Sequence, residues 1–321
     1  MKTCLIYGHD GLDLDVTYNL RSFYRKLGFR VFFSKILYDA DILVVTRALD
    51  REINLSGMHY ALIHVYDYTG WDYDAFVRSV DQGKTYIFCT SESRKERLIN
   101  QLNFPEDKIF IALPPVDVTI WCKKLKDLKY PMVHIGNFKQ IADNDTIGVL
   151  FNEALTHFNI HIWGSGWKGF NKFYHGKAGL FQVSSIYSKS EFAFGLMYPF
   201  QRGNTFSGRF WHAPLNGCSL LSEAGYYTSK MPGIIETDYS LYDIKEKTDC
   251  KIDRKKIQKE SIEFWKKQNE ITLGYVKITL TSFKEQRFST LNYLNFIHNK
   301  IYNTLFKCYQ KSGLSRFIIR K

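Results

Sequence analysis

The sequence predicts an α/β fold with two Rossmann-like domains followed by C-terminal helices. Short apolar runs alternate with amphipathic runs along most of the chain, the apolar runs contain few polar residues, and the last part has a helical pattern. Nearly continuous apolar strands separated by helices are typical of a parallel sheet covered on both faces. We expect domains at residues 1–128 and 129–252, and a basic helical segment at 253–321.

In the first domain, strands are predicted where apolar runs end at polar or glycine-containing loops. Ser91 is expected to cap a helix, because its hydroxyl can accept a hydrogen bond from a free backbone N–H group. Ligands of parallel sheets bind beyond the carboxyl ends of the strands, so loops 8–15 and 67–71 are expected to face a cleft. The predicted strands are 3–7, 30–33, 41–46, 60–66, 84–89 and 108–113, and the predicted helices are 16–27, 74–80 and 92–102.

The second domain repeats this alternation, and a helical pattern resumes at about Asp253. An apolar helical face is predicted near the end of the chain, at Leu294, Ile297, Ile301, Leu305 and Cys308. The predicted strands of the second domain are 132–136, 160–163, 192–197, 218–221 and 233–236, and its predicted helices are 145–157, 183–190 and 239–247.

Composition limits the class of protein. A chain of 321 residues with 45% hydrophobic and 24% charged residues is typical of a globular protein of two domains. The six cysteines are scattered singly, which argues against a zinc site or a disulfide framework. The first apolar run is too short for a signal peptide, and no run approaches the ~20 apolar residues of a membrane span. We therefore expect a cytoplasmic protein.

The net charge of +12 is concentrated at the end of the chain, because residues 245–321 contain 18 Lys and Arg against 7 Asp and Glu. Such a segment attracts an anionic membrane or a nucleic acid, or it is only a solvated basic face. The basic residues are interleaved with apolar helical positions, and no nucleic-acid-binding motif is present. We expect an anionic membrane surface as the partner, and no nucleic acid.

The segment from Asn204 to Gly217 is the strongest functional signal. It lies between two apolar strand-like runs, and its Gly/Asn/Ser loop opens a predicted helix. Free backbone N–H groups and the positive end of a helix dipole make such a position an anion site. Arg209 adds a guanidinium that suits a phosphate. The segment therefore predicts a nucleotide diphosphate site, with an ordinary strand–loop–helix connection as the alternative.

Several segments resemble the GT-B glycosyltransferases, and some resemble their family-4-like and spore-maturation (CgeB-like) branches. The resemblance covers about residues 85–240 and implies a GT-B fold, with a nucleotide-sugar donor in the second domain and the acceptor on the side of the first. The segments that carry it are Cys89–Ser93, Pro114–Asp117, His134–Lys139, His161–Trp167, Tyr174–Gly176, Ser185–Tyr187 and Arg209–Gly217.

The resemblance also implies the donor-site residues. We expect Arg209, Ser207, Gly208 and Lys139 at the diphosphate and Val183 at the nucleobase. The positions at which family-4-like relatives carry two glutamates are here Asn204 and His212, which puts a retaining mechanism in doubt. Gly164, Ser165 and Gly166 are further candidates, which either allow the backbone to approach the ligand closely or form a plain tight turn. Glu223 is either a ribose ligand or an exposed loop acid. His212 is either a ligand of a hydroxyl group or a helix-surface histidine.

A glycosyl transfer that inverts the anomeric carbon also needs a base. Asp10, Asp67 and His9 are the candidates, because they follow predicted strands of the first domain. Tyr68 and Trp71 either stack on an acceptor sugar or belong to the edge of the core. We expect no cofactor and no metal, because no carboxylate cluster requires one.

The sequence thus predicts a glycosyltransferase that uses a nucleotide-sugar donor of the UDP or GDP type. The expected acceptor is a glycan or a lipid-linked glycan in bacterial surface polysaccharide synthesis at the inner face of the membrane. The alternatives are a nucleotide-sugar epimerase or hydrolase of the same fold, a nucleic-acid-binding protein, and a non-catalytic glycan-binding subunit.

Overall fold

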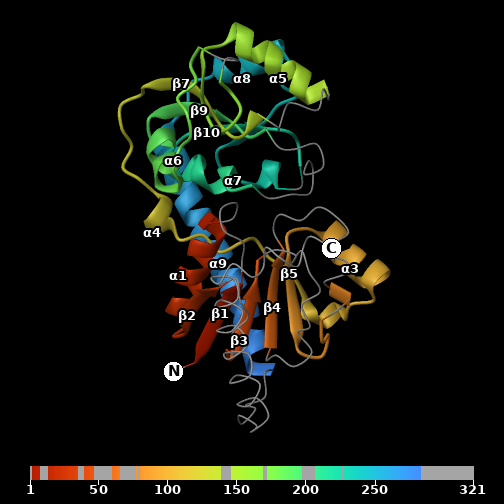
Figure 1. Ribbon diagram of the computed structural model, residues 1–321. Helices are drawn as coiled ribbons and strands as arrows, with labels where there is room; N and C mark the ends of the chain where they lie inside the picture. The colour runs from red at the N-terminus through yellow and green to blue at the C-terminus, as the bar shows by residue number, and fades with distance from the viewer. Residues whose placement is uncertain are drawn as a thin grey trace, which may run out of the picture.

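The structure is a computed structural model with two parallel β-sheets, one in each half of the molecule (Figure 1). The two sheets and the helices around them confirm the predicted α/β class. The residues that the structure describes are 2–7, 14–34, 40–46, 60–65, 77–78, 80–138, 146–168, 172–196, 207–225 and 227–282.

The first sheet has the strand order β2-β1-β3-β4-β5-β6, and every neighbouring pair is parallel. Cys4 and Ile6 belong to one hydrophobic cluster and Leu5 to another, so the two faces of β1 pack against different cores. Ser91 caps α3 as predicted, because its side chain accepts from the N–H of Arg94. The elements are β1 (Thr3–Tyr7), α1 (Leu14–Lys26), β2 (Arg30–Ser34), β3 (Ile42–Val45), β4 (Tyr60–Val65), β5 (Thr85–Cys89), α3 (Glu92–Leu102) and β6 (Ile109–Ile111).

The second sheet has the order β11-β10-β9-β7-β8 and is also parallel. The helix expected at 183–190 begins three residues earlier and ends before the strand that follows it. The elements are β7 (Tyr130–Ile135), α5 (Thr146–His157), β8 (Ile160–Trp163), α6 (Leu180–Tyr187), β9 (Ser190–Phe194), α7 (Arg209–His212), β10 (Ser219–Ser222), β11 (Ile234–Glu236) and α8 (Leu241–Thr248).

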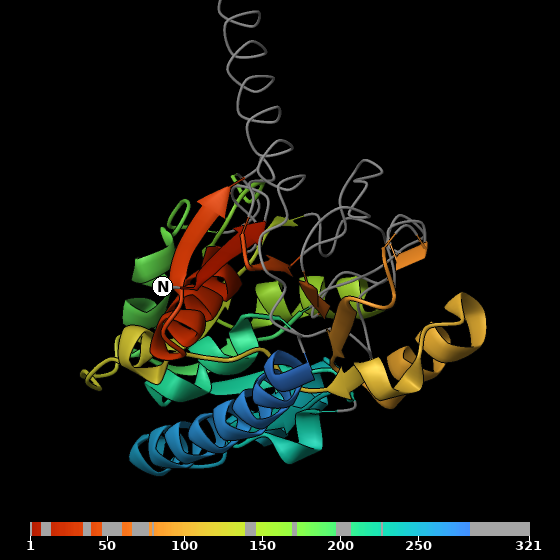
Figure 2. The same cartoon turned by 90° about the horizontal axis from the view of Figure 1, so that it is seen from below.

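The last described helix, α9 (Arg254–Ser282), serves both halves of the molecule. Its 29 residues give a rod of about 43 Å at 1.5 Å per residue. Figures 1 and 2 show this rod (blue) starting beside the second domain and running along the first. No helix in the described part of the chain is long and apolar enough to cross a bilayer. The apolar face expected at 294–308 lies outside the described residues.

Hydrogen bonds fix α9 to its surroundings at several points. Arg254 donates to the carbonyl oxygen of Lys126 in the linker at 2.9 Å and to that of Ser188, directly after α6, at 2.5 Å. Further along, the amide of Asn269 donates to the carbonyl of Val116 at 2.8 Å and accepts from its N–H at 2.9 Å. These bonds leave α9 no freedom to slide along its axis.

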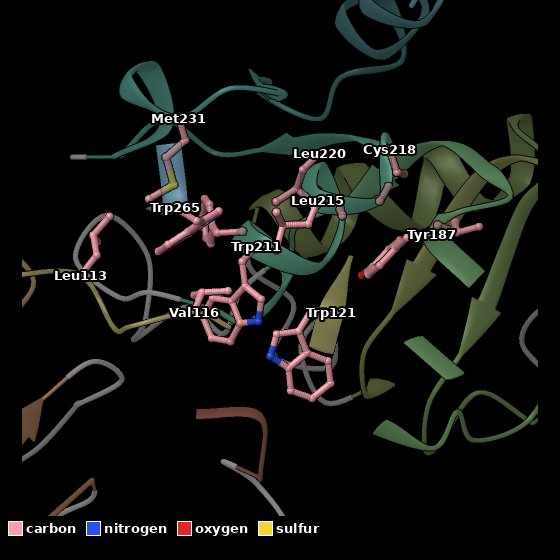
Figure 3. Packing of buried hydrophobic residues seen from close by; sticks show 14 of the residues in the cluster. Leu113, Val116, Trp121, Tyr187, Trp211, Leu215, Cys218, Leu220, Met231 and Trp265 are labelled. Carbon is pink, nitrogen blue, oxygen red and sulfur yellow. The ribbon is translucent and has the colours of Figure 1, made fainter. Parts of the chain in front are cut away.

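A tryptophan-rich cluster fills the space between the linker, α7 and α9 (Figure 3). Trp121 ends the short linker helix α4 (Val118–Trp121), Trp211 belongs to α7, and Trp265 belongs to α9. All three side chains are at most 1% exposed, and the rings of Trp211 and Trp265 meet edge to face at 6.2 Å. Burial of such large rings is the main source of stability at a contact of this kind.

Asp117 ties α1 to the linker. Its carboxylate accepts from the hydroxyls of Ser22 and Thr119 and from Lys26 Nζ at 3.1 Å. Burial alone would raise the pKa of this carboxyl, but the hydrogen bonds from Ser22, Thr119 and Lys26 outweigh it and lower the pKa to about 2. Since an unfolded aspartate has a pKa near 4, the charged form stabilises the folded state.

We expect Asp117→Asn to lower the free energy of unfolding by about 2 kcal/mol at pH 7, from a shift of nearly two pKa units. The folded pKa is depressed, so this contribution is present above about pH 5 and is lost as the pH falls from about 4 through 2. Urea unfolding at several pH values measures it. Glu106→Gln, which removes an exposed pair with Lys95, should cost less than about 1 kcal/mol. An equal loss for both variants would contradict the role of Asp117.

Candidate functional site

Two turns lie side by side at the carboxyl ends of β7 and β8. The N–H of Gly136 donates to the carbonyl of Trp163, and the N–H of Phe138 donates to the carbonyl of Ser165, both at 2.9 Å. The side chain of Asn137 accepts from the N–H of Ser165 at 3.0 Å. We call residues 136–138 and 164–166 the turn pair. The strand ends that the sequence placed in a donor site are therefore one hydrogen-bonded unit.

Gly164 is required for this close approach. Its φ is +150°, and a Cβ atom there would lie 1.8 Å from the carbonyl oxygen of Gly136. The same oxygen accepts from the indole N–H of Trp167 at 2.7 Å, so it cannot move away freely. Gly166, with φ +85°, completes the turn against Phe138. The glycines keep the backbone of the turn pair free of side chains.

Arg209 lies beside the turn pair. Its Nη1 donates to the carbonyl of Ile135, the last residue of β7, at 3.4 Å, and its Nε donates to Ser207 Oγ at 3.3 Å. Burial raises the pKa of the Tyr187 hydroxyl, and the positive charge of Arg209 opposes that rise. Arg209 thus provides positive charge at the carboxyl edge of the second sheet.

The helix that was expected to run on from Arg209 is short. α7 ends at His212, and a 3₁₀ turn over Pro214–Asn216 follows it. Proline lacks an N–H group and its ring disfavours continuation of an α-helix, and Gly217 then takes a left-handed conformation with φ +67°. A helix of four residues has little macrodipole, so the side chain of Arg209 is the main charge at this position.

His212 is buried, so the interpretation of this residue as a helix-surface histidine is wrong. Its side chain is 5% exposed and its Nε2 lies 3.4 Å from Asp15 Oδ2 in the first domain. Its Nδ1 lies 3.4 Å from the hydroxyl of Ser184 in α6, and its ring meets that of Trp121 edge to face at 4.7 Å. With a proton on Nε2, the imidazole donates to the carboxylate and accepts from the serine.

Asp15 was missed by sequence reasoning. It is in the first turn of α1, where a carboxylate normally serves only to interact with the helix dipole, and its side chain is 16% exposed. A Cβ atom on Gly208 would lie 2.3 Å from Asp15 Oδ2, so only glycine at 208 lets this carboxylate approach. Its position at the end of loop 8–15, which was expected to face a cleft, was the available signal, but the contact with His212 depends on the packing of the two domains.

Comparison with known proteins gives the fold a name. No family model matches the sequence, and neither does any curated protein. Solved structures do match. AviGT4, a glycosyltransferase involved in avilamycin A biosynthesis, has a TM-score of 0.60 at 12% identity over 88% of this chain and 100% of that one. The chain has the GT-B fold.

Two further solved structures with the GT-B fold contain a bound nucleotide. Anabaena Alr3699/HepE in complex with UDP has a TM-score of 0.56 at 10% identity, covering 88% of this chain and 100% of that one. T4 phage BGT in complex with UDP and Mn²⁺ has a TM-score of 0.57 at 12% identity, covering 87% and 99%. These likenesses confirm the GT-B fold, whereas membership of the family-4-like or CgeB-like branch stays a prediction.

Two other predicted donor residues lie in α6 and after β10. Val183 is in the first turn of α6, where its N–H donates to the carbonyl of Gly179 at 3.3 Å. Glu223 follows β10. Because β9 lies between β10 and β7 in the sheet, Glu223 is not beside the turn pair. Glu223 is 7% exposed, so its interpretation as an exposed loop acid is wrong. The contact of Val183 with the nucleobase and the contact of Glu223 with the ribose both stay predictions.

The remaining candidates lie outside the described residues: His9, Asp10, Asp67, Tyr68, Trp71, Lys139 and Asn204. Their roles stay predictions. Among the residues that are described, no three His, Cys, Asp or Glu side chains stand close enough together to hold a metal ion.

We expect Gly164→Ala to destabilise the second domain by more than about 3 kcal/mol, because the new methyl group overlaps the carbonyl of Gly136. Gly176→Ala is the matched control: Gly176 also has a positive φ of +85°, but nothing lies within 4 Å of its added Cβ. It should cost only about 1–2 kcal/mol of backbone strain. Urea unfolding measures both, and similar losses would contradict the close packing of the turn pair.

Proposed function

We propose that this protein is a glycosyltransferase that moves a sugar from a nucleotide-sugar donor to a hydroxyl acceptor. The observation that carries the proposal is the position of Arg209, beside the turn pair at the carboxyl edge of the second sheet. Arg209 is also within one helical turn of His212, which contacts Asp15 of the first domain. Ligands of open α/β sheets bind at this edge. The UDP bound by HepE and T4 phage BGT supports a nucleotide diphosphate as the ligand.

Arg209 and the backbone of the turn pair are the proposed diphosphate site. As the bond between the anomeric carbon and the phosphate oxygen breaks, its electron pair goes to the leaving diphosphate. The Arg209 guanidinium is already in place and stabilises that charge without reorganisation. Because Arg209 supplies the positive charge, we propose that the reaction needs no metal ion.

The acceptor hydroxyl must lose its proton as its oxygen bonds to the anomeric carbon. We propose that the base comes from the first domain, as expected for Asp10, Asp67 or His9, and that Asp15 is the best candidate among the described residues. His212 fixes the Asp15 carboxylate from the other side of the domain interface. Transfer by direct displacement would invert the anomeric configuration, which the missing family-4-like glutamates also favour.

We propose a glycan or lipid-linked glycan as the acceptor, in surface polysaccharide synthesis at the cytoplasmic face of a bacterial membrane. The excess of basic residues in 245–321 supports this, because anionic lipids attract clustered Lys and Arg. Incubation with UDP-, GDP- and CMP-sugars, with and without glycan acceptors, tests the activity. Release of the nucleotide that is the same with and without any acceptor would instead indicate a hydrolase.

We expect UDP or GDP to raise the melting temperature, since a ligand at 100 times its Kd adds about 2.7 kcal/mol of stability. Arg209→Ala should abolish most of this shift, because the diphosphate loses its main cation, and Arg209→Lys should retain part of it. Thermal unfolding in the presence of EDTA measures the shift and tests metal independence. Arg97→Ala, on α3 of the first domain, is the control. An undiminished shift in Arg209→Ala would contradict the site.

We expect Asp15→Asn to lower turnover at least about 100-fold, the usual minimum loss when a general base is removed. Its nucleotide-induced thermal shift should remain, because Arg209, the main cation of the proposed diphosphate site, is unchanged. Donor consumption in the presence of acceptor measures turnover, and Asp81→Asn, at an exposed turn of the first domain, is the control. Full turnover in Asp15→Asn together with its loss in Asp10→Asn or Asp67→Asn would assign the base to one of those residues instead.

A further inference from the structure

Three cations lie close together on α1. Arg21, Arg25 and Lys26 line an open cavity of about 400 Å³, which we call the α1 cavity. Lys26 also lines a second cavity of about 400 Å³, where Lys266 and Lys277 of α9 join it. The other described residues that line the α1 cavity are Tyr18, Ser22 and Ile120, so no described residue of its wall carries a carboxylate.

The described part of the chain neutralises only one of the three cations of the α1 cavity. Asp117 pairs with Lys26 at 3.1 Å, but no described acid pairs with Arg21 or Arg25. The Nε of Arg21 is buried and has no hydrogen-bond partner, and the Arg25 side chain is exposed. Guanidinium groups in this state have donors free for an anion, and phosphate is the anion whose geometry they fit best.

Exposed phenylalanines surround this charge. Phe32 and Phe33 on the edge strand β2 are 41% and 42% exposed, and Phe181 in the first turn of α6 is 54% exposed. The Arg21 guanidinium lies 5.3 Å from the ring centre of Phe33. Tyr18, in the wall of the α1 cavity, lies 5.6 Å from Phe181, ring to ring. Large exposed apolar side chains that gather in one place mark an interaction surface.

We propose that the α1 cavity and these three phenylalanines dock the protein on a membrane of anionic phospholipid. Lipid phosphates would bind Arg21 and Arg25, while the aromatic rings enter the interfacial layer beside them. Phe32 and Phe33 are consecutive on a strand and so point to opposite faces of the sheet. They therefore cannot form one stacking platform for the bases of a nucleic acid, but both can enter a bilayer that meets the edge of the sheet.

This surface extends the membrane association proposed above for the basic C-terminal segment and places the first domain itself against the lipid. It is separate from the diphosphate site, since Arg209 lies in the second domain. Vesicle binding and nucleotide binding are therefore independent measurements, and failure of one leaves the other standing.

The test is co-sedimentation of the full chain with vesicles of phosphatidylcholine alone or mixed with phosphatidylglycerol. We expect binding only to the anionic vesicles. Arg21→Gln/Arg25→Gln should weaken it about 30-fold, from two cations near an anionic leaflet. Phe32→Ser/Phe33→Ser should weaken vesicle binding most at high salt, because salt screens the charged contacts and leaves the apolar contacts in place. Arg78→Gln/Arg97→Gln, at two exposed positions of the first domain outside both the α1 cavity and segment 245–321, removes the same charge elsewhere and should have less than a tenth of that effect.

Equal weakening by the two charge-removing doubles would overturn the proposal, because net charge alone would then explain binding. Tighter binding to a single-stranded oligonucleotide than to anionic vesicles would also overturn it. Thermal unfolding with and without nucleotide shows that each variant is folded. Arg25→Gln alone, at an exposed position, is expected to weaken vesicle binding about fivefold from the loss of one cation, and an unchanged affinity would count against the α1 cavity.

Discussion

The packing of α9 across both domains is the contact on which the rest of the structure depends. The two sheets share no strand, so their relative position is set by the linker, by α9 and by the tryptophan cluster between them. Trp265 contributes to that cluster, while Val276, three turns further along the same helix, is buried in the core of the first domain. The single helix α9 therefore helps to set the position of the second domain relative to the first.

The candidate site is a product of that geometry. Asp15 and His212 are nearly 200 positions apart in the sequence, and they meet at 3.4 Å only because α1 and α7 both pack against the linker. Trp121 illustrates the connection, since its ring contacts His212 and its indole N–H donates to Asn19 of α1 at 2.6 Å. A disturbance of the linker would thus reach the site without touching any residue that contacts substrate.

The sequence predicted the parts of the fold that depend on local pattern. Apolar runs located the strands, and Ser91 located the start of α3. The strand-end glycine at 164 pointed to close backbone packing, because few other residues accept that conformation. The sequence could not predict that α9 would cross both domains. An amphipathic pattern shows that one face of a helix is buried, but it does not show which part of the protein covers that face. Asp15 escaped for the same reason: its role comes from a contact with His212 and Gly208 that no local feature specifies.

The course of α9 also has a consequence for biosynthesis. Val276 and its neighbours Leu273 and Leu280 complete a core that is otherwise built from α1 and the strands of the first sheet, all within the first 112 residues. Chains emerge from the ribosome with the N-terminus first, and domains ordinarily fold as they appear. Here the first domain leaves the ribosome with an apolar face still uncovered, and it keeps that face open until α9 has also been translated. During that interval the nascent chain exposes apolar surface that the finished structure buries.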